Sequence, residues 1–383
     1  MNQTLIKNVR LWTMDAQDVR APGWLLIGDG KITALGYGAP PDCENVLDGD
    51  GGVLTPGLID IHSHLGLYED GLGFEGADGN EDTDPVTPQL RAIDGINPFD
   101  ESLHDAALGG VTTVCTGPGS SNVLGGTFAA FKTVGKCIDD MCILPEAAMK
   151  CAFGENPKRC YRDKSITSRM STAAKLRDIL FRAREYQRKV DLAGDDESKL
   201  PAFNLQLHAM LPVMRGQIPL KAHAHQANDI LTAVRIAKEF GVKLTLEHVT
   251  DGALIVDELV RANVPLAVGP TFGQPSKIEL KNKSWKTPGI LNKAGCHVSI
   301  ITDSPVTEQR HLRFCAAMAV NGGMDPFEAF RAVTLYPAEH IGIADRVGSI
   351  EVGKDADFAL MDGDLFSLQT NVVATYILGS PVC

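Results

Sequence analysis

The sequence has no run of basic residues, and its 383 residues carry a formal net charge of −12. Proteins that bind nucleic acids neutralise phosphates with clustered Lys and Arg, so we expect no nucleic-acid partner. The chain also has no window of about 20 consecutive apolar residues, the length that crosses a bilayer. The N-terminal MNQTLIKNVRLWTMD contains no apolar stretch long enough for a signal peptide. These absences predict a cytoplasmic protein with no membrane partner.

The chain has no C-x-x-C pair, which argues against a structural zinc ribbon. Its nine cysteines are odd in number, and Cys115, Cys151 and Cys315 lie inside apolar runs. This usage is typical of buried reduced thiols and not of a disulfide framework. With 44% hydrophobic residues, 38 Gly and 21 Pro, the composition indicates a loop-rich globular protein, neither disordered nor fibrous.

Short β segments separated by turns occupy both ends of the chain. We expect them at residues 4–12, 24–27, 31–35, 46–53, 358–361 and 375–378. Two β-rich ends that enclose a long middle predict one small β-sandwich domain built from residues 1–54 and 347–383.

In the middle of the chain, apolar β-rich runs alternate with helical patterns, which is typical of βα units and a parallel sheet. Candidate strands cover residues 58–62, 111–115, 127–134, 147–153, 220–224, 242–247, 265–268 and 297–302. Eight candidates match an α/β fold of the (β/α)8 TIM barrel type, expected over residues 55–346. The candidate at 127–134 has the weakest pattern.

Helix signals support this reading. From Ala173 to Val190, apolar residues recur at three- and four-residue intervals, which predicts one buried helix face. Asp325 and Pro326 read as an N-cap and the first residue of another helix. A third helix is expected over residues 228–240, ended by Gly241.

The strongest local signal is the pair His62 and His64 at the end of the first candidate strand. Side chains alternate along a strand, so both imidazoles project to the same side, roughly 6.5 to 7 Å apart along the chain. Taken alone, a His-x-His is more often two ordinary histidines. Here it is joined by His223, His248 and Asp303, each at the end of a later candidate strand. In a parallel barrel these ends face one rim, so we expect a metal site there.

With these ligands in this order, the sequence resembles the amidohydrolase superfamily. Its members carry a His-x-His on the first barrel strand, histidines after the fifth and sixth strands, and an aspartate after the eighth. The resemblance covers nearly the whole chain, because the family's split β domain matches both ends. Residues 56–64 and 348–357 are most similar to the imidazolonepropionase-related branch. The resemblance implies a metal-dependent hydrolase that holds one or two divalent ions, with zinc as the expected metal.

A two-metal member of that family needs a bridging anion from the fourth strand, commonly a carboxylated lysine. Lys150 is one candidate, because a lysine among apolar neighbours is costly as a cation and can lose its charge. It could equally form a structural ion pair with a barrel carboxylate. Glu155, just past the same strand, is the competing metal ligand, since a carboxylate needs no modification. The sequence leaves the two open.

Two further residues are expected to act in the reaction. Asp303 is the candidate general acid and base, because a carboxylate beside a metal-activated hydroxide can take its proton and pass it to a leaving nitrogen. His225 shares the face of His223 and is expected either to stabilise a developing oxyanion or to support His223. Gln226 stands where deaminases of the superfamily usually place a glutamate, which counts against deamination.

The loops suggest a substrate pocket. Residues 117–126 are glycine-rich but lack the Gly-Lys-Ser/Thr ending of a phosphate-binding loop, so we expect them to shape the barrel rim. Arg159, Arg162 and Arg169 follow the fourth strand and could pair with a substrate carboxylate, although most arginines in such segments are solvated.

The favoured hypothesis is hydrolysis of an amide or cyclic amide C–N bond in a small molecule, by a homo-oligomeric enzyme other than a typical peptide protease. The first alternative is a metal-dependent deaminase of a nucleobase or a guanidine-type compound. The second is a catalytically silent metal-binding scaffold. The loops of the barrel set the substrate specificity, and one sequence does not give their conformation.

Overall fold

The computed structural model describes residues 3–15, 19–69 and 71–382, whose strands form two sheets. The first is a mostly antiparallel sheet in the order β16-β15-β14-β5-β1-β2-β3, with β4 beside β1. Its strands are β1 (Gln3–Trp12), β2 (Val19–Gly28), β3 (Lys31–Tyr37), β4 (Asn45–Asp48), β5 (Val53–Pro56), β14 (Phe358–Met361), β15 (Val372–Ile377) and β16 (Ser380–Pro381).

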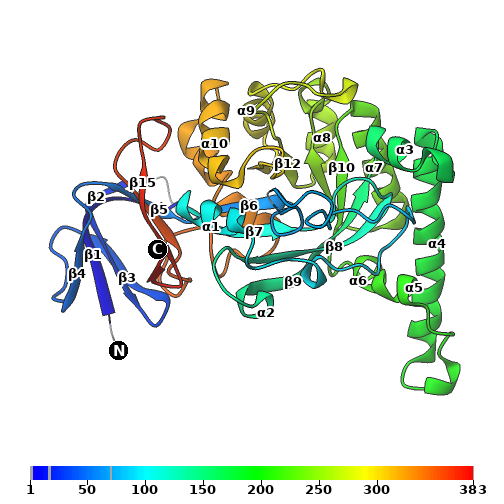
Figure 1. Ribbon diagram of the computed structural model, residues 1–383, viewed down its shortest axis with the longest axis horizontal. Helices are drawn as coiled ribbons and strands as arrows, with labels where there is room; N and C mark the ends of the chain where they lie inside the picture. The colour runs from blue at the N-terminus through cyan, green and yellow to red at the C-terminus, as the bar shows by residue number, and fades with distance from the viewer. Residues whose placement is uncertain (1–2, 16–18, 70, 383) are drawn as a thin grey trace.

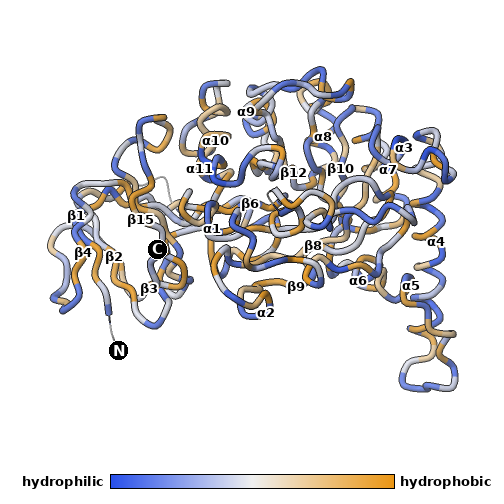
Figure 2. Tube along the Cα trace, in the orientation of Figure 1, coloured by the Kyte–Doolittle hydropathy of each residue, from blue (hydrophilic) through white to orange (hydrophobic). Residues whose placement is uncertain are grey.

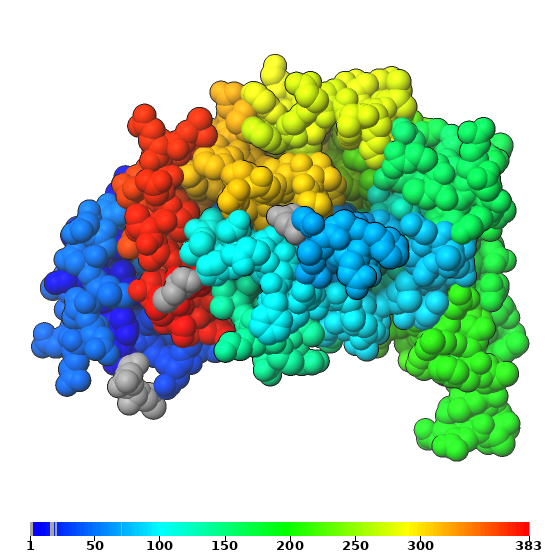
Figure 3. Space-filling view, viewed as in Figure 1, coloured from blue at the N-terminus to red at the C-terminus, as the bar shows by residue number. Residues whose placement is uncertain are grey.

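The two ends of the chain meet in this sheet, because β14 pairs with β5 in antiparallel register, from Phe358 opposite Pro56 to Met361 opposite Val53. Figure 1 shows the N-terminal strands in blue beside the C-terminal strands in red, and Figure 3 shows the same ends in contact on the molecular surface. A separate apolar core that includes Leu25, Leu54 and Phe358 supports the sheet. The domain limits at 54/55 and 346/347 stay predictions.

The second sheet has eight strands within the described residues and curls into a nearly closed barrel, in the order β13-β12-β11-β10-β9-β8-β7-β6. Its strands are β6 (Leu58–Ser63), β7 (Val111–Thr116), β8 (Leu124–Lys132), β9 (Cys142–Ala152), β10 (Leu220–Ala224), β11 (Leu244–His248), β12 (Leu266–Val268) and β13 (Val298–Ile300). The expected α/β fold, a barrel with a small β domain, is confirmed.

One barrel strand departs from the expected all-parallel order. β8 runs antiparallel to both β7 and β9. Only residues 117–123 connect β7 to β8, and a parallel pair needs a crossover of about a dozen residues or more. The chain therefore turns back directly, and the weak pattern at residues 127–134 belongs to a strand in the reverse direction.

Hydrogen bonds just beyond the strands bring the first and last strands of the barrel together. Asp303 N donates to His62 O at 3.2 Å, and His64 N donates to Ser304 O at 2.9 Å. The buried carboxylate of Asp60 on β6 accepts from the backbone N and the hydroxyl of Thr302, at 2.9 and 2.6 Å. These contacts fix Asp303 beside the His-x-His of β6.

Helices cover the outside of the barrel (Figure 1). They are α1 (Glu101–Leu108), α2 (Ile138–Met141), α3 (Glu155–Cys160), α4 (Arg169–Ala193), α5 (Leu205–Ala209), α6 (Leu211–Met214), α7 (Ala227–Phe240), α8 (Val256–Ala262), α9 (Lys286–Lys293), α10 (Leu312–Asn321), α11 (Pro326–Arg331) and α12 (Leu335–His340). The three helices expected from sequence are confirmed. Asp325 caps α11 by accepting from Phe327 N and Glu328 N, and Gly241 ends α7 in a left-handed conformation.

Strand alternation divides the barrel residues between two environments. On β9 and β10, Met149, Cys151, Leu220 and Ala222 belong to the apolar core shared with α4 and α7. In Figure 2 the barrel strands carry much of the apolar colour, while the outer loops are largely hydrophilic. The alternate residues of these strands face the barrel interior and include Lys150, Lys221 and His223. The interior face therefore supplies the chemistry, and the exterior face supplies the packing.

Eight cysteines fall within the described residues, and all of them are free thiols. In the same part of the chain, none of the helices combines the length and apolar character that crossing a lipid bilayer requires.

Candidate active site

The ends of β6 and β13 bring three predicted ligands together. Asp303 Oδ1 lies 3.3 Å from His62 Nε2 and 3.2 Å from His64 Nε2. The rings of His62 and His248 are 4.9 Å apart, and His62, His248 and Asp303 each present a ligand atom within 4.8 Å of the others. The side chains are buried or nearly so, with Asp303 the most exposed of this group at 16%. Such a group can hold a metal ion.

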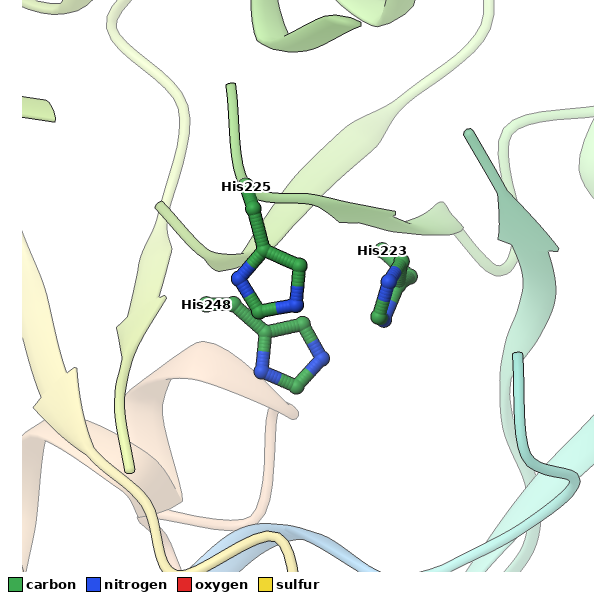
Figure 4. Close-up of side chains that lie close together, drawn as sticks. All are labelled: His223, His225 and His248. Carbon is green, nitrogen blue, oxygen red and sulfur yellow. The ribbon is translucent and has the colours of Figure 1, made fainter. Parts of the chain in front are cut away.

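A second group adjoins the first and shares His248 with it. His223 and His225 on either side of Ala224 turn their rings toward His248, at centroid distances of 4.4 and 4.6 Å (Figure 4). The ligand atoms of these three histidines also lie within 4.8 Å of one another. The two neighbouring groups share His248, so together they could hold one or two ions.

Several histidines are oriented by an oxygen acceptor at Nδ1. His62 Nδ1 donates to Glu247 Oε2 at 2.7 Å, His64 Nδ1 to Gly117 O at 2.6 Å, and His248 Nδ1 to Gly269 O at 2.8 Å. Because these acceptors carry no proton, the hydrogen must lie on Nδ1, which leaves the Nε2 lone pair free. This is the usual way in which a protein fixes the tautomer of a metal-binding histidine.

Other nitrogens in the site have no polar partner. Both ring nitrogens of His223 and the Nε2 of His248 are buried and have no hydrogen-bond partner among the described residues. An unsatisfied buried polar atom is costly, so such atoms need an explanation. A metal ion that accepts their lone pairs would supply one, and the residues present therefore fit a divalent ion.

The electrostatics favour neutral imidazoles. Burial lowers the pKa of His223 and His225 well below the ordinary value and that of His248 to about 3. Burial alone would raise the pKa of Asp303, but the surrounding histidines His248, His62 and His64 outweigh it and hold that pKa well below its usual range. Neutral imidazole and ionised carboxylate are the forms that bind metal.

Lys150 reaches the same centre from β9. Its Nζ lies 3.2 Å from His62 Nε2, and the side chain is fully buried. Burial lowers the pKa of Lys150 to about 8, so roughly a tenth of it is free amine at pH 7, far more than for an ordinary lysine. Lys221 on β10 is also buried, but its Nζ has a carboxylate partner, Glu247 Oε2, at 2.8 Å. Of these two lysines, only Lys150 is therefore placed to become a free amine beside the histidines.

Glu155 lies farther along the chain, at the start of α3. Its backbone N donates to Glu279 Oε2 at 2.9 Å, and its side-chain Oε2 is buried with no hydrogen-bond partner among the described residues. Within those residues it belongs to neither of the two ligand groups. The structure thus brings together the predicted histidines, Asp303 and Lys150, and leaves Glu155 outside these groups.

His225 and Gln226 have different surroundings. His225 Nδ1 lies 2.8 Å from the hydroxyl of Thr250, and its Nε2 lies 3.9 Å from Glu279 Oε1. The side chain of Gln226 instead accepts a hydrogen bond from Arg169 at 2.8 Å, and Arg169 also pairs with Asp229. His225 therefore belongs to the histidine group, whereas Gln226 is part of a neighbouring polar network.

A pocket of about 350 Å³ opens beside these residues, and His64, His223, His225 and Asp303 form part of its wall. Its rim is built from the loops after the strands, including Tyr68, residues 119–121 and Arg159. A larger pocket of about 610 Å³ lies at the opposite mouth, where it is lined by residues that precede or begin β9 to β12. The smaller pocket is the candidate active site, because residues of both possible ligand groups line it and barrel enzymes act at the carboxyl ends of their strands.

Sequence reasoning missed the polar groups beneath the histidines. Glu247 is buried, binds His62 and Lys221, and accepts a hydrogen bond from Thr245 at 2.8 Å. Alternation could have found it, because Thr245 and Glu247 share a strand face. Alternation would place the next residue, His248, on the opposite face, but His248 also turns inward. Its φ of 71° breaks the extended backbone at the strand end.

The sequence pattern of the amidohydrolase family matches residues 167–382, more than half of the chain. A solved structure of an amidohydrolase from Thermotoga maritima MSB8 is 37% identical in sequence, with a TM-score of 0.95 over 99% of each chain. The chain therefore belongs to the amidohydrolase family, and the resemblance inferred from its motifs is confirmed.

Three curated relatives are similar over most of this chain. Amidohydrolase tasK of Hapsidospora irregularis is 28% identical over 98% of this chain and 43% of its own length. Adenine deaminase 2 of Shouchella clausii is 24% identical over 94% of this chain and 56% of its own length. Imidazolonepropionase of Thermoplasma volcanium is 23% identical, with 89% and 84% covered. The chain thus spans less than two thirds of the length of the first two relatives.

Proposed function

We propose that the protein is a metal-dependent hydrolase that cleaves the C–N bond of an amide or cyclic amide in a small molecule. One observation carries the proposal: His62, His64, His223, His248 and Asp303 converge at the carboxyl mouth of the barrel, where His64, His223 and Asp303 line a pocket. Family membership supports a reaction at a C–N bond.

The ions would be held by the histidines of β6, β10 and β11 together with Asp303, and zinc suits this set of nitrogen and carboxylate ligands. A divalent ion bound there would lower the pKa of water and polarise the carbonyl of the substrate. Lys150 is the favoured bridge if carbon dioxide adds to its amine, because its Nζ lies among the ligands and Glu155 is in neither ligand group.

Asp303 is the proposed proton carrier. Its carboxylate is ionised and lies at the pocket wall, so it can accept a proton from the attacking water. As the carbon–oxygen bond forms and the carbon–nitrogen bond breaks, the same group would give that proton to the leaving nitrogen. His225 would hydrogen-bond the developing negative charge on the carbonyl oxygen, because it also lines the pocket.

The test is the Asp303→Asn variant of the zinc-loaded protein. We expect turnover of an amide substrate, found by screening dipeptides, N-acyl amino acids and lactams, to fall by a factor of about 10² to 10⁴. Zinc bound per chain, measured by elemental analysis, should stay at the wild-type value or drop by at most one ion. Full activity in this variant would reject the role of Asp303.

Deamination is the second candidate, because one relative is named adenine deaminase 2. Against it, Gln226 replaces the expected glutamate, and its side chain binds Arg169. Release of ammonia from adenine or a guanidine compound, with no turnover of amides, would favour this candidate. Bound metal with no turnover of any compound would instead favour a silent scaffold. A homo-oligomer in the cytoplasm remains our prediction for the protein in the cell.

A further inference from the structure

Three cationic side chains line the pocket that also contains Asp303. Arg159 comes from α3, and Lys277 and Lys283 come from the segment between β12 and α9. Of the three arginines that sequence reasoning linked to a substrate carboxylate, only Arg159 lines this pocket within the described residues. Arg169 is already committed to Asp229 at 2.9 Å.

The three cations differ in their own partners. Lys277 Nζ lies 2.7 Å from Glu279 Oε1 and 3.0 Å from Asn156 Oδ1, so the protein already compensates its charge. Lys283 donates to the backbone O of Phe272 at 2.6 Å. In the part of the chain that the structure describes, neither Lys283 nor Arg159 has a carboxylate within ion-pair distance. Two positive charges of the pocket thus have no counterion among the described residues.

Lys283 also has charge interactions with Asp303 and His225. Burial lowers its pKa, and the negative charge of Asp303 opposes that shift. The charge of Lys283 in turn contributes to the lowered pKa of His225, after burial and nearer charges. A partly buried ammonium is most stable when an anion approaches it, because the anion recovers the charge interaction lost with water. The position suits an anionic group of the molecule whose reacting bond lies at Asp303.

We propose that the substrate carries a carboxylate, which Lys283 and Arg159 bind at the pocket wall while the scissile C–N bond lies beside Asp303. N-acyl amino acids and lactams that bear a carboxylate are the substrate classes that combine both features. The volume of about 350 Å³ falls in the range of small-molecule sites. This inference rests on the proposed function, because it treats the pocket as the place where the substrate lies.

The experiment compares two probes that differ in one charge, N-acetylglycine and N-acetylglycinamide. Their binding is measured by titration calorimetry on the zinc-loaded protein and again after zinc is removed with a chelator, because a carboxylate could also bind the ion. We expect the acid to bind roughly ten- to a hundredfold more tightly than the amide in both states. The Lys283→Met variant should lose most of that preference, and the Lys283→Met and Arg159→Met double variant should lose the rest.

Lys281→Met and Arg162→Met are the matched controls, since both side chains are exposed and lie outside the pocket lining. Both should keep the wild-type preference, and thermal unfolding should show that all variants fold. Equal binding of the two probes, or no binding of the acid, would overturn the proposal. A preference that survives in the double variant would overturn it as well. Tighter binding of inorganic phosphate that depends on Lys283 would assign the pocket to phosphate instead.

The two proposals can fail separately. If the acid is preferred through Lys283 but no amide is hydrolysed, the proposed hydrolase function fails and the carboxylate subsite stands. If neutral amides are hydrolysed with the same efficiency as their carboxylate analogues, the hydrolase function stands and the carboxylate proposal fails.

Discussion

His62 Nδ1 lies 2.7 Å from Glu247 Oε2, and both side chains are fully buried inside the barrel. Burial alone would raise the pKa of Glu247, but Lys221 and His62 outweigh it and hold that pKa well below its usual range. The carboxylate is therefore ionised, keeps the proton of His62 on Nδ1, and directs Nε2 toward Asp303. A charged network beneath the site thus fixes the orientation of the first predicted metal ligand.

The first prediction concerns this network. Glu247→Gln should lower the free energy of unfolding of the metal-free protein by about 3 kcal/mol, because the buried Lys221 ammonium loses its partner. Adding Lys221→Met should restore part of that loss, since the unpaired charge is then gone. Chemical denaturation of the three proteins measures this. If the single variant is as stable as the wild type, the carboxylate does not hold the lysine as described.

The second prediction concerns carboxylation of Lys150. A free amine reacts with carbon dioxide to give a carbamate and a proton, and the lowered pKa of about 8 makes the amine available. Zinc reconstitution in ¹³C-bicarbonate should therefore give one labelled carbamate per chain in the carbon NMR spectrum. Lys150→Met should lose the label and one zinc ion, whereas Lys221→Met should keep the label. A wild-type protein with two ions and no label would contradict the bridge.

The third prediction concerns pH. Burial lowers the pKa of His248 from 6.5 to about 3, so below pH 6.5 the unfolded chain takes up a proton that the folded metal-free chain does not. Stability should fall as the pH drops from 6.5 toward 3, with His248 contributing about 1.4 kcal/mol per pH unit in that window. The His248→Asn variant should show a shallower dependence. Asparagine suits this position because it tolerates the positive φ of 71°.

Equal slopes in the two proteins would mean that His248 is not kept neutral by the fold. Denaturant unfolding at several pH values, in the presence of a chelator, gives both slopes.

Much of the fold follows from local patterns in the sequence. The expected strands at 220–224 and 358–361 match β10 and β14, because apolar alternation and flanking turns define both ends. Asp325 and Pro326 likewise define the start of α11. The reversal of β8 was not predicted, because a strand pattern carries no direction. It depends on a connection too short for a crossover.

The candidate site could likewise be predicted only in part from the sequence. Strand-end position was enough to single out His62, His64, His223, His248 and Asp303. Position alone could not choose between Lys150 and Glu155, because the choice depends on distances across the barrel. The proposed role of Lys283 also depends on tertiary structure, since its loop after β12 carries no periodic pattern that would place it in the same pocket as Asp303.

The central claim, that histidines distant in sequence bind a shared ion, is tested most directly by X-ray diffraction from zinc-loaded crystals at the zinc absorption edge. The account predicts an anomalous peak about 2.0–2.1 Å from nitrogens of His62, His64 or His248, and a second near His223 if two ions bind. Peaks only at other places on the protein, or none at these histidines when the crystal contains stoichiometric zinc, would contradict it.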